Sequence, residues 1–75
     1  MARRQAFRPQ LIKFEWDEHT ESDETGHLNG VYKMPSGPDL RAMKDNVVMA
    51  DKEEVDAAKA AIVASLRARY VEVTG

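Results

Sequence analysis

Two histidines and four of the five carboxylates within residues 17–27 are candidate metal ligands, because side chains of these types can bind metal ions or exchange protons. The six residues are Asp17, Glu18, His19, Asp23, Glu24 and His27. Their spacing matches neither the His-Glu-x-x-His motif of zinc enzymes nor the EF-hand calcium loop, which has fixed ligand positions and a central glycine. A solvated loop would also lose conformational entropy on closing around an ion. We therefore predict no metal site in this segment.

Nucleophilic and cofactor-dependent catalysis have little support in the residue types present. Cysteine is absent, and Ser22, Ser36 and Ser65 do not lie in a Gly-x-Ser-x-Gly pattern. No glycine-rich phosphate-binding motif occurs. A chain of 75 residues has little interior in which to bury a carboxylate and shift its pKa. We predict that the protein is not an enzyme and that it has no catalytic residues and no cofactor.

Charge is segregated along the chain although the formal net charge is only -2. Residues 1–13 contain four bases and no acid, whereas residues 14–25 contain six acids and no base. Blocks of like charge usually stay solvated and often form interaction tails. The pattern predicts a flexible basic N-terminal arm over residues 1–9 and an acidic loop over residues 17–27.

The acidic loop is the first candidate interface, because it would be attracted to a basic groove on a larger protein. Its candidate partner-binding residues are Asp17, Glu18, Glu21, Asp23 and Glu24. The leading hypothesis is therefore a non-enzymatic adaptor or regulator, such as an inhibitor or modulator of a larger machine.

The basic arm supports a different hypothesis, a nucleic-acid-binding accessory or transcription-regulatory protein. Its candidate residues are Arg3, Arg4, Phe7 and Arg8, which would neutralise phosphates and stack on a base. The sequence pI of about 5.6 is far below that of typical nucleic-acid binders, so this hypothesis ranks second.

The elements that would position these residues begin with a strand over residues 10–16. Ile12, Phe14 and Trp16 alternate with polar residues, which predicts that they face the core. Asn29-Gly30 favours a turn, and a short strand is expected over residues 31–34. Residues 35–38 form a Pro- and Gly-containing turn cluster. A short helix would follow over residues 38–44, and the apolar run over residues 46–49 predicts a brief strand or an extended lead-in to the next helix.

A long C-terminal helix is expected over residues 51–69, with Asp51 as its N-cap and Glu54 three residues later. At helical spacing, one stripe of side chains faces the core: Val55, Ala58, Ile62, Val63 and Leu66. Lys59 interrupts this stripe, and we expect its methylenes to cover the core edge. The alternation after Tyr70 predicts a final strand over residues 70–74.

The opposite side of this helix carries a stripe of alanines. Helix propensity alone explains such a stripe, but small side chains would also let a partner helix approach closely. Ala57, Ala61 and Ala64 are therefore added to the candidate partner-binding residues. If a second copy used this stripe, the protein would be a homodimeric structural protein, which is the third hypothesis.

Together these elements predict one small α+β domain over residues 10–75. Its long amphipathic C-terminal helix would pack on a small, mostly antiparallel sheet. No apolar run approaches the roughly 20 residues needed to cross a membrane, so no membrane association is expected. The absence of cysteine fits a reducing compartment, and a cytoplasmic location is the expectation.

Overall fold

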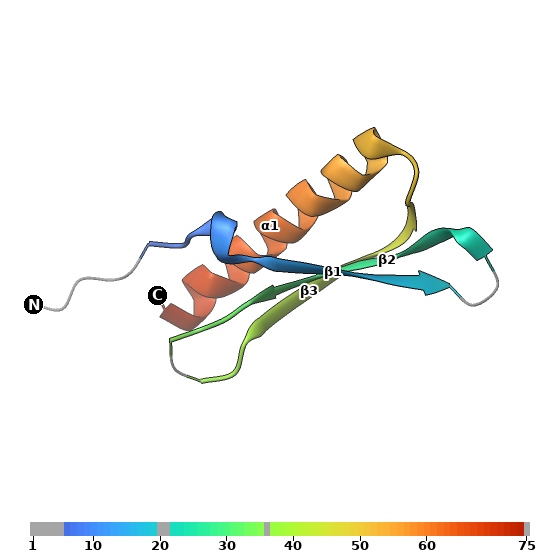
Figure 1. The fold of residues 1–75 in the computed structure, drawn as a ribbon. Helices are drawn as coiled ribbons and strands as arrows, with labels where there is room; N and C mark the ends of the chain where they lie inside the picture. The colour runs from blue at the N-terminus through green and yellow to red at the C-terminus, as the bar shows by residue number, and fades with distance from the viewer. Residues whose placement is uncertain (1–5, 20–21, 36, 75) are drawn as a thin grey trace, which may run out of the picture.

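The computed structural model describes residues 6–19, 22–35 and 37–74, with the backbone alone at residues 18, 19, 22 and 23. The elements are η1 (Pro9–Leu11), β1 (Lys13–His19), β2 (Ser22–Tyr32), β3 (Leu40–Val48) and α1 (Lys52–Thr74). The strands form an antiparallel sheet in the order β1-β2-β3, and α1 packs across one face of it (Figure 1). This arrangement confirms the predicted α+β fold with one C-terminal helix on an antiparallel sheet.

The inward face of β1 agrees with the sequence pattern, but the strand is shifted. Residues 10 and 11, the beginning of the predicted strand, belong instead to a 3-10 turn that starts at Pro9, and β1 continues to His19. Ile12 is buried, and Phe14 and Trp16 are partly buried against the core.

The predicted acidic loop over residues 17–27 is wrong, because these residues lie largely within β1 and β2. Asp17 is paired with His27 in the sheet. Only one face of a sheet covered by a single helix must be apolar. Leu28 supplies that face, whereas the side chains of Asp17 and His27 lie on the other, where polar residues are stable. A search for apolar alternation therefore could not detect this hairpin.

The predicted Asn29-Gly30 turn is also wrong, because both residues lie inside β2. Of the predicted strand over residues 31–34, Val31 and Tyr32 form the end of β2. Gly30 is required for packing instead of for a turn. A Cβ at this position would collide with Cγ2 of Ile62 on the covering helix.

The predicted helix over residues 38–44 is replaced by β3, which also includes most of the predicted strand over residues 46–49. Leu40 and Met43 have helical spacing, but in a strand they lie on opposite faces. Leu40 is accordingly buried, while Met43 is 56% exposed. The pairing of β2 with β3 changes register between Gly26 and Leu28. Asn46 lies on β3 at this shift and has a positive φ of 54°.

The long helix is confirmed but extends further than expected, and the predicted strand over residues 70–74 is wrong. Tyr70 lies one turn beyond Leu66 and continues the buried stripe, which explains the extension of α1 to Thr74. The alternating Val71 and Val73 are each 59% exposed. Lys59 is exposed on α1, and its Nζ lies 5.6 Å from the centroid of the Phe14 ring.

Candidate functional site

The face of the sheet opposite α1 is the open face, and its side chains form three rows across the strands. The first row is Lys13, Val31 and Arg41, the second is Glu15, Asn29 and Met43, and the third is Asp17, His27 and Asp45. A shallow hollow runs along β2 between the flanking strands. Such rows follow from the strand period of two, which places every second residue on this face.

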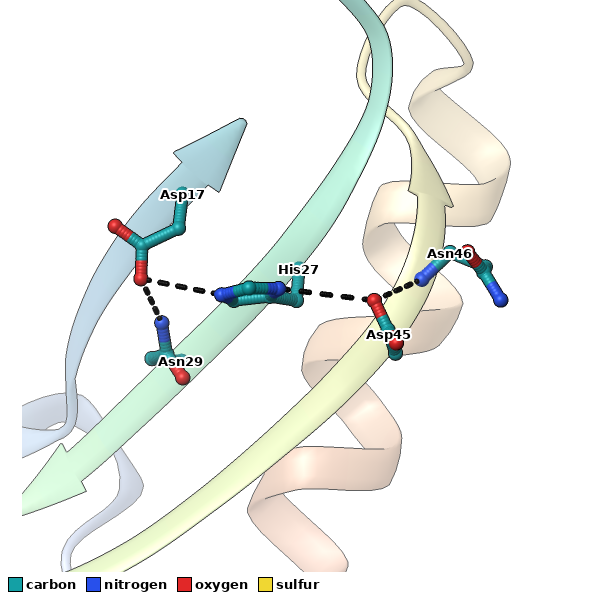
Figure 2. A network of polar contacts seen from close by, with 5 residues as sticks. All are labelled: Asp17, His27, Asn29, Asp45 and Asn46. Carbon is teal, nitrogen blue, oxygen red and sulfur yellow. Dashed lines mark hydrogen bonds and ion pairs between the residues drawn. The ribbon is translucent and has the colours of Figure 1, made fainter. Parts of the chain in front are cut away.

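The third row is a network of polar contacts that joins all three strands (Figure 2). The Nε2 of His27 lies 3.3 Å from Oδ2 of Asp17, and its Nδ1 lies 3.7 Å from Oδ1 of Asp45. Asn29 donates its side-chain N–H to the same Asp17 oxygen at 2.8 Å. The backbone N–H of Asn46 donates to Oδ1 of Asp45, also at 2.8 Å.

This geometry differs from that of a catalytic histidine. In nucleophilic triads one imidazole nitrogen is held by a carboxylate while the other faces the nucleophile. Both nitrogens of His27 face carboxylates, so the contacts here link strands to one another. Among the described side chains, no group of three or more potential metal ligands is placed to hold an ion.

Folding also concentrates like charges at the two ends of the molecule. The strands are antiparallel and α1 runs back along them, so distant segments meet at each end. We call one end the acidic end: Asp17, Glu24, Asp45, Asp51, Glu53, Glu54 and Asp56. We call the other the basic end: Arg8, Lys13, Lys33, Arg41, Arg67 and Arg69. Lys44 and Lys52 lie at the acidic end, and Asp39 and Glu72 lie at the basic end.

Specific contacts bring these segments together. At the acidic end, the backbone N–H of Val48 donates to Oε1 of Glu54 at 3.1 Å. At the basic end, the guanidinium of Arg69 donates to the carbonyl of Arg41 at 3.3 Å. The molecule is elongated, with extents of 51 × 22 × 17 Å, so the two ends are well separated.

The predicted partner-binding residues are only partly brought together. Asp17 and Glu24 lie at the acidic end, but the side chains of Glu18 and Asp23, and all of Glu21, lie outside the described residues. Ala57 and Ala61 line a groove between α1 and the end of β3. Ala64 is exposed on α1 but does not line this groove.

Sequence reasoning missed Asp45 as a neighbour of these residues. It lines the same groove as Ala57 and Ala61, together with Lys44, Asn46, Val47, Glu54 and Ala58. The expected helix over residues 38–44 gives no reason to place Asp45 beside these alanines, whereas β3 carries it to the edge of the groove.

The candidate nucleic-acid-binding residues divide in the same way. Arg3 and Arg4 lie outside the described residues. The Phe7 ring packs against Tyr32 and Tyr70, with centroids 4.8 and 5.6 Å apart, and Arg67 lies 5.3 Å from its centroid. The ring is therefore engaged within the fold instead of standing free for a base.

Arg8 is exposed, and its backbone N–H donates to the Tyr32 hydroxyl at 3.2 Å. Lys33 lines the same pocket as Arg8, and Arg41, Arg67 and Arg69 lie at the same end of the molecule. Sequence reasoning missed these bases because they lie far from Arg8 in the chain. Only the return of the strands and of α1 to this end brings them together.

Within the described ranges, no helix combines the length and the apolar character that crossing a membrane requires. No protein-family model matches the chain, and no curated protein or solved structure matches it either.

Proposed function

We propose that this protein is a non-enzymatic binding module, an adaptor or regulator that docks its acidic end on a basic surface of a larger protein. The observation that carries the proposal is the gathering of acids from every strand and from the first turns of α1 at one end. The acidic end holds seven of the described acids and only two bases. Because its two ends carry opposite charge, an elongated molecule of this kind would be oriented by the electric field of a charged partner before contact.

The groove between α1 and β3 supplies the apolar part of this surface. Ala57 and Ala61 form one wall, and their small side chains allow close approach of another backbone. Asp45 and Glu54 border the same groove, so a partner with an apolar ridge beside basic residues would match both features.

The test compares two variants with equal losses of charge. Glu53→Gln with Asp56→Asn removes two negative charges from the acidic end, whereas Asp39→Asn with Glu72→Gln removes the two negative charges of the basic end. Parent and variants serve as baits in nuclease-treated cell lysate, and the affinity of any stoichiometric protein partner is then measured at two salt concentrations. We expect on the order of tenfold weaker binding and a smaller salt effect for the first variant alone. Equal affinities for all three baits would rule out the acidic end as the interface.

A second candidate function, nucleic-acid binding, is favoured by the gathering of six bases at the basic end. Arg8 and Lys33 flank one shallow pocket there, and both side chains are exposed. These basic side chains would contact the phosphates, whereas the Phe7 ring packs within the fold.

Fluorescence anisotropy with labelled single-stranded and duplex oligonucleotides at low salt tests this function. Replacing Arg8 and Lys33 by Gln should lower the salt slope of binding by about 2, one unit for each lost phosphate contact. Replacing Lys44 and Lys52 by Gln is the matched control, because these bases lie at the acidic end. Binding that is undetectable for the parent would end this candidate.

A further inference from the structure

The three rows on the open face are complementary to the same rows on a second copy. The first row carries two bases, Lys13 and Arg41, and the third carries two acids, Asp17 and Asp45. In both of these rows one charged residue lies on the edge strand β1 and the other on the edge strand β3, so each edge strand carries one base and one acid from these rows. We propose that two copies of this chain stack through their open faces as a two-fold symmetric dimer. This inference goes beyond the proposed docking of the acidic end on another protein, although Asp17 and Asp45 belong to both surfaces.

Only one orientation of the two-fold axis satisfies the charges. In this orientation the axis lies midway between the two sheets, perpendicular to the strands, and passes along the second row. Each β1 then lies over the β1 of the other copy, and each first row lies over the other copy's third row. Each Lys13 then faces an Asp17, and each Arg41 faces an Asp45. An axis along the strands would instead place Lys13 over Arg41 and Asp17 over Asp45, so like charges would oppose each other.

Side-chain length supports the same orientation. Stacked sheets lie about 10 Å apart, and residues two apart in a strand are separated by about 6.6 Å. In the proposed pairing a long base always meets a short aspartate, so the combined length is similar at all four contacts. Lys13 has 76% of its side chain exposed, and its Nζ lies 3.6 Å from Oε1 of Glu15 in the same chain. This exposed ion pair is weak, so Lys13 can exchange it for the partner copy's Asp17.

The second row lies on the axis, where each residue meets its own copy. Met43 is 56% exposed on the open face, and its pairing would bury apolar surface that is now in water. Asn29 would meet Asn29 and can exchange amide hydrogen bonds with it. Glu15 would meet Glu15, which is the one unfavourable pair that this symmetry creates.

The face is small, so the dimer should be weak. Three strands provide less area than a standard protein interface, and we expect a dissociation constant between about 10 μM and 1 mM at low salt. Because its contacts are mainly between exposed charges, the dissociation constant should rise with ionic strength.

Sedimentation equilibrium of charge-reversed variants tests the proposal. Lys13→Glu with Arg41→Glu makes the face acidic, and Asp17→Lys with Asp45→Lys makes it basic. Each variant alone should dimerise at least about tenfold more weakly than the parent, since every cross-pair becomes repulsive. An equimolar mixture should form a heterodimer, because the first and third rows are again complementary.

The control variant, Lys44→Glu with Lys52→Glu, changes the net charge equally at residues away from the open face, and it should dimerise like the parent. A parent that stays monomeric at 1 mM protein, about the weakest association expected for this face, would overturn the proposal. So would reversed variants that dimerise normally, or a mixture that stays monomeric.

A single conservative substitution provides a second test of the dimer if a charge-reversed variant fails to fold. Glu15→Gln removes the repulsion on the axis and should tighten the dimer about threefold. Unchanged or weaker dimerisation of Glu15→Gln would contradict the proposed axis. Failure of either test leaves the docking of the acidic end untouched, because the docking test uses Glu53 and Asp56 on α1.

Discussion

At the scale of single residues, Asn29 and Gly30 are neighbours in β2 that serve opposite faces of the sheet. Asn29 donates a hydrogen bond to Asp17 on the open face, whereas Gly30 lets α1 approach the sheet closely. The same pair of residues is typical of tight turns, since both tolerate a positive φ. Here the pair lies in a strand and Gly30 packs beneath Ile62, which is distant in the sequence, so no local pattern around Asn29 and Gly30 can reveal this contact.

Gly30→Ala should lower the free energy of unfolding by about 1–3 kcal/mol, the usual cost of inserting a methyl group into a packed core. The added Cβ would collide with Cγ2 of Ile62 and contact Ile12 and Leu66. Chemical denaturation of Gly30→Ala in an Ile62→Ala background is the control, because that background lacks the colliding carbon. The cost there should be much smaller, and equal costs in both backgrounds would contradict the close approach.

Asn46 has a positive φ of 54°, a left-handed conformation that asparagine tolerates better than most residues. Asn46→Gly should therefore leave the melting temperature unchanged or slightly higher. Asn46→Val should destabilise the protein by about 1–2 kcal/mol, since a β-branched side chain is strained in this region. Thermal melting of both variants beside Lys44→Val, at an ordinary exposed strand position, gives the comparison. A valine tolerated equally at positions 44 and 46 would count against this backbone geometry.

At the scale of elements, β1 and α1 could be predicted because each has one continuous apolar face and, for α1, a cap. The predicted stripe on α1 is confirmed by the burial of Ala58, Ile62 and Leu66. β2 and β3 could not be predicted, because polar residues and glycines interrupt their patterns. In a three-stranded sheet covered on one face, half of every strand faces water, and this dilutes the apolar signal.

The first turn of α1 is held by a cap in which Glu54 donates its backbone N–H to Oδ1 of Asp51 at 3.1 Å. Asp51→Ala should lower the free energy of unfolding by about 1 kcal/mol, because it leaves that N–H without its side-chain acceptor. Asp51→Asn keeps an acceptor and should retain most of the stability. Urea denaturation distinguishes these results, and equal losses for both variants would indicate that charge matters there more than the hydrogen bond.

At the scale of the whole molecule, the segment before η1 is tied to the end of α1. Phe7, Tyr32 and Tyr70 form an aromatic cluster, and Tyr32 and Tyr70 meet edge to face at 5.6 Å. Part of the predicted flexible arm over residues 1–9 therefore packs on the fold. The cluster joins residues from the beginning, middle and end of the chain. It therefore holds together the three segments that meet at the basic end.

Phe7→Ala should destabilise the whole fold by about 2 kcal/mol, below the usual cost for a fully buried aromatic because Phe7 is only partly buried. Hydrogen exchange in the last turn of α1 should also accelerate, since Tyr70 loses a packing partner. Phe7→Leu is the control, because it keeps most of the apolar volume and should restore much of the protection. Unchanged exchange in Phe7→Ala would show that the cluster does not hold the helix end.

The sequence by itself determined the fold class, the helix and its cap, and the buried face of β1, because those features depend on short-range periodicity and local hydrogen bonding. Tertiary structure alone decided that residues 17–19 and 22–27 become strands and that Gly30 lies beneath Ile62. Tertiary structure likewise decided that Asp17, His27 and Asp45 meet across three strands. It also decided which charges share an end and which share the open face. These outcomes depend on register and on the return path of the chain, and residue types along a single segment do not encode them.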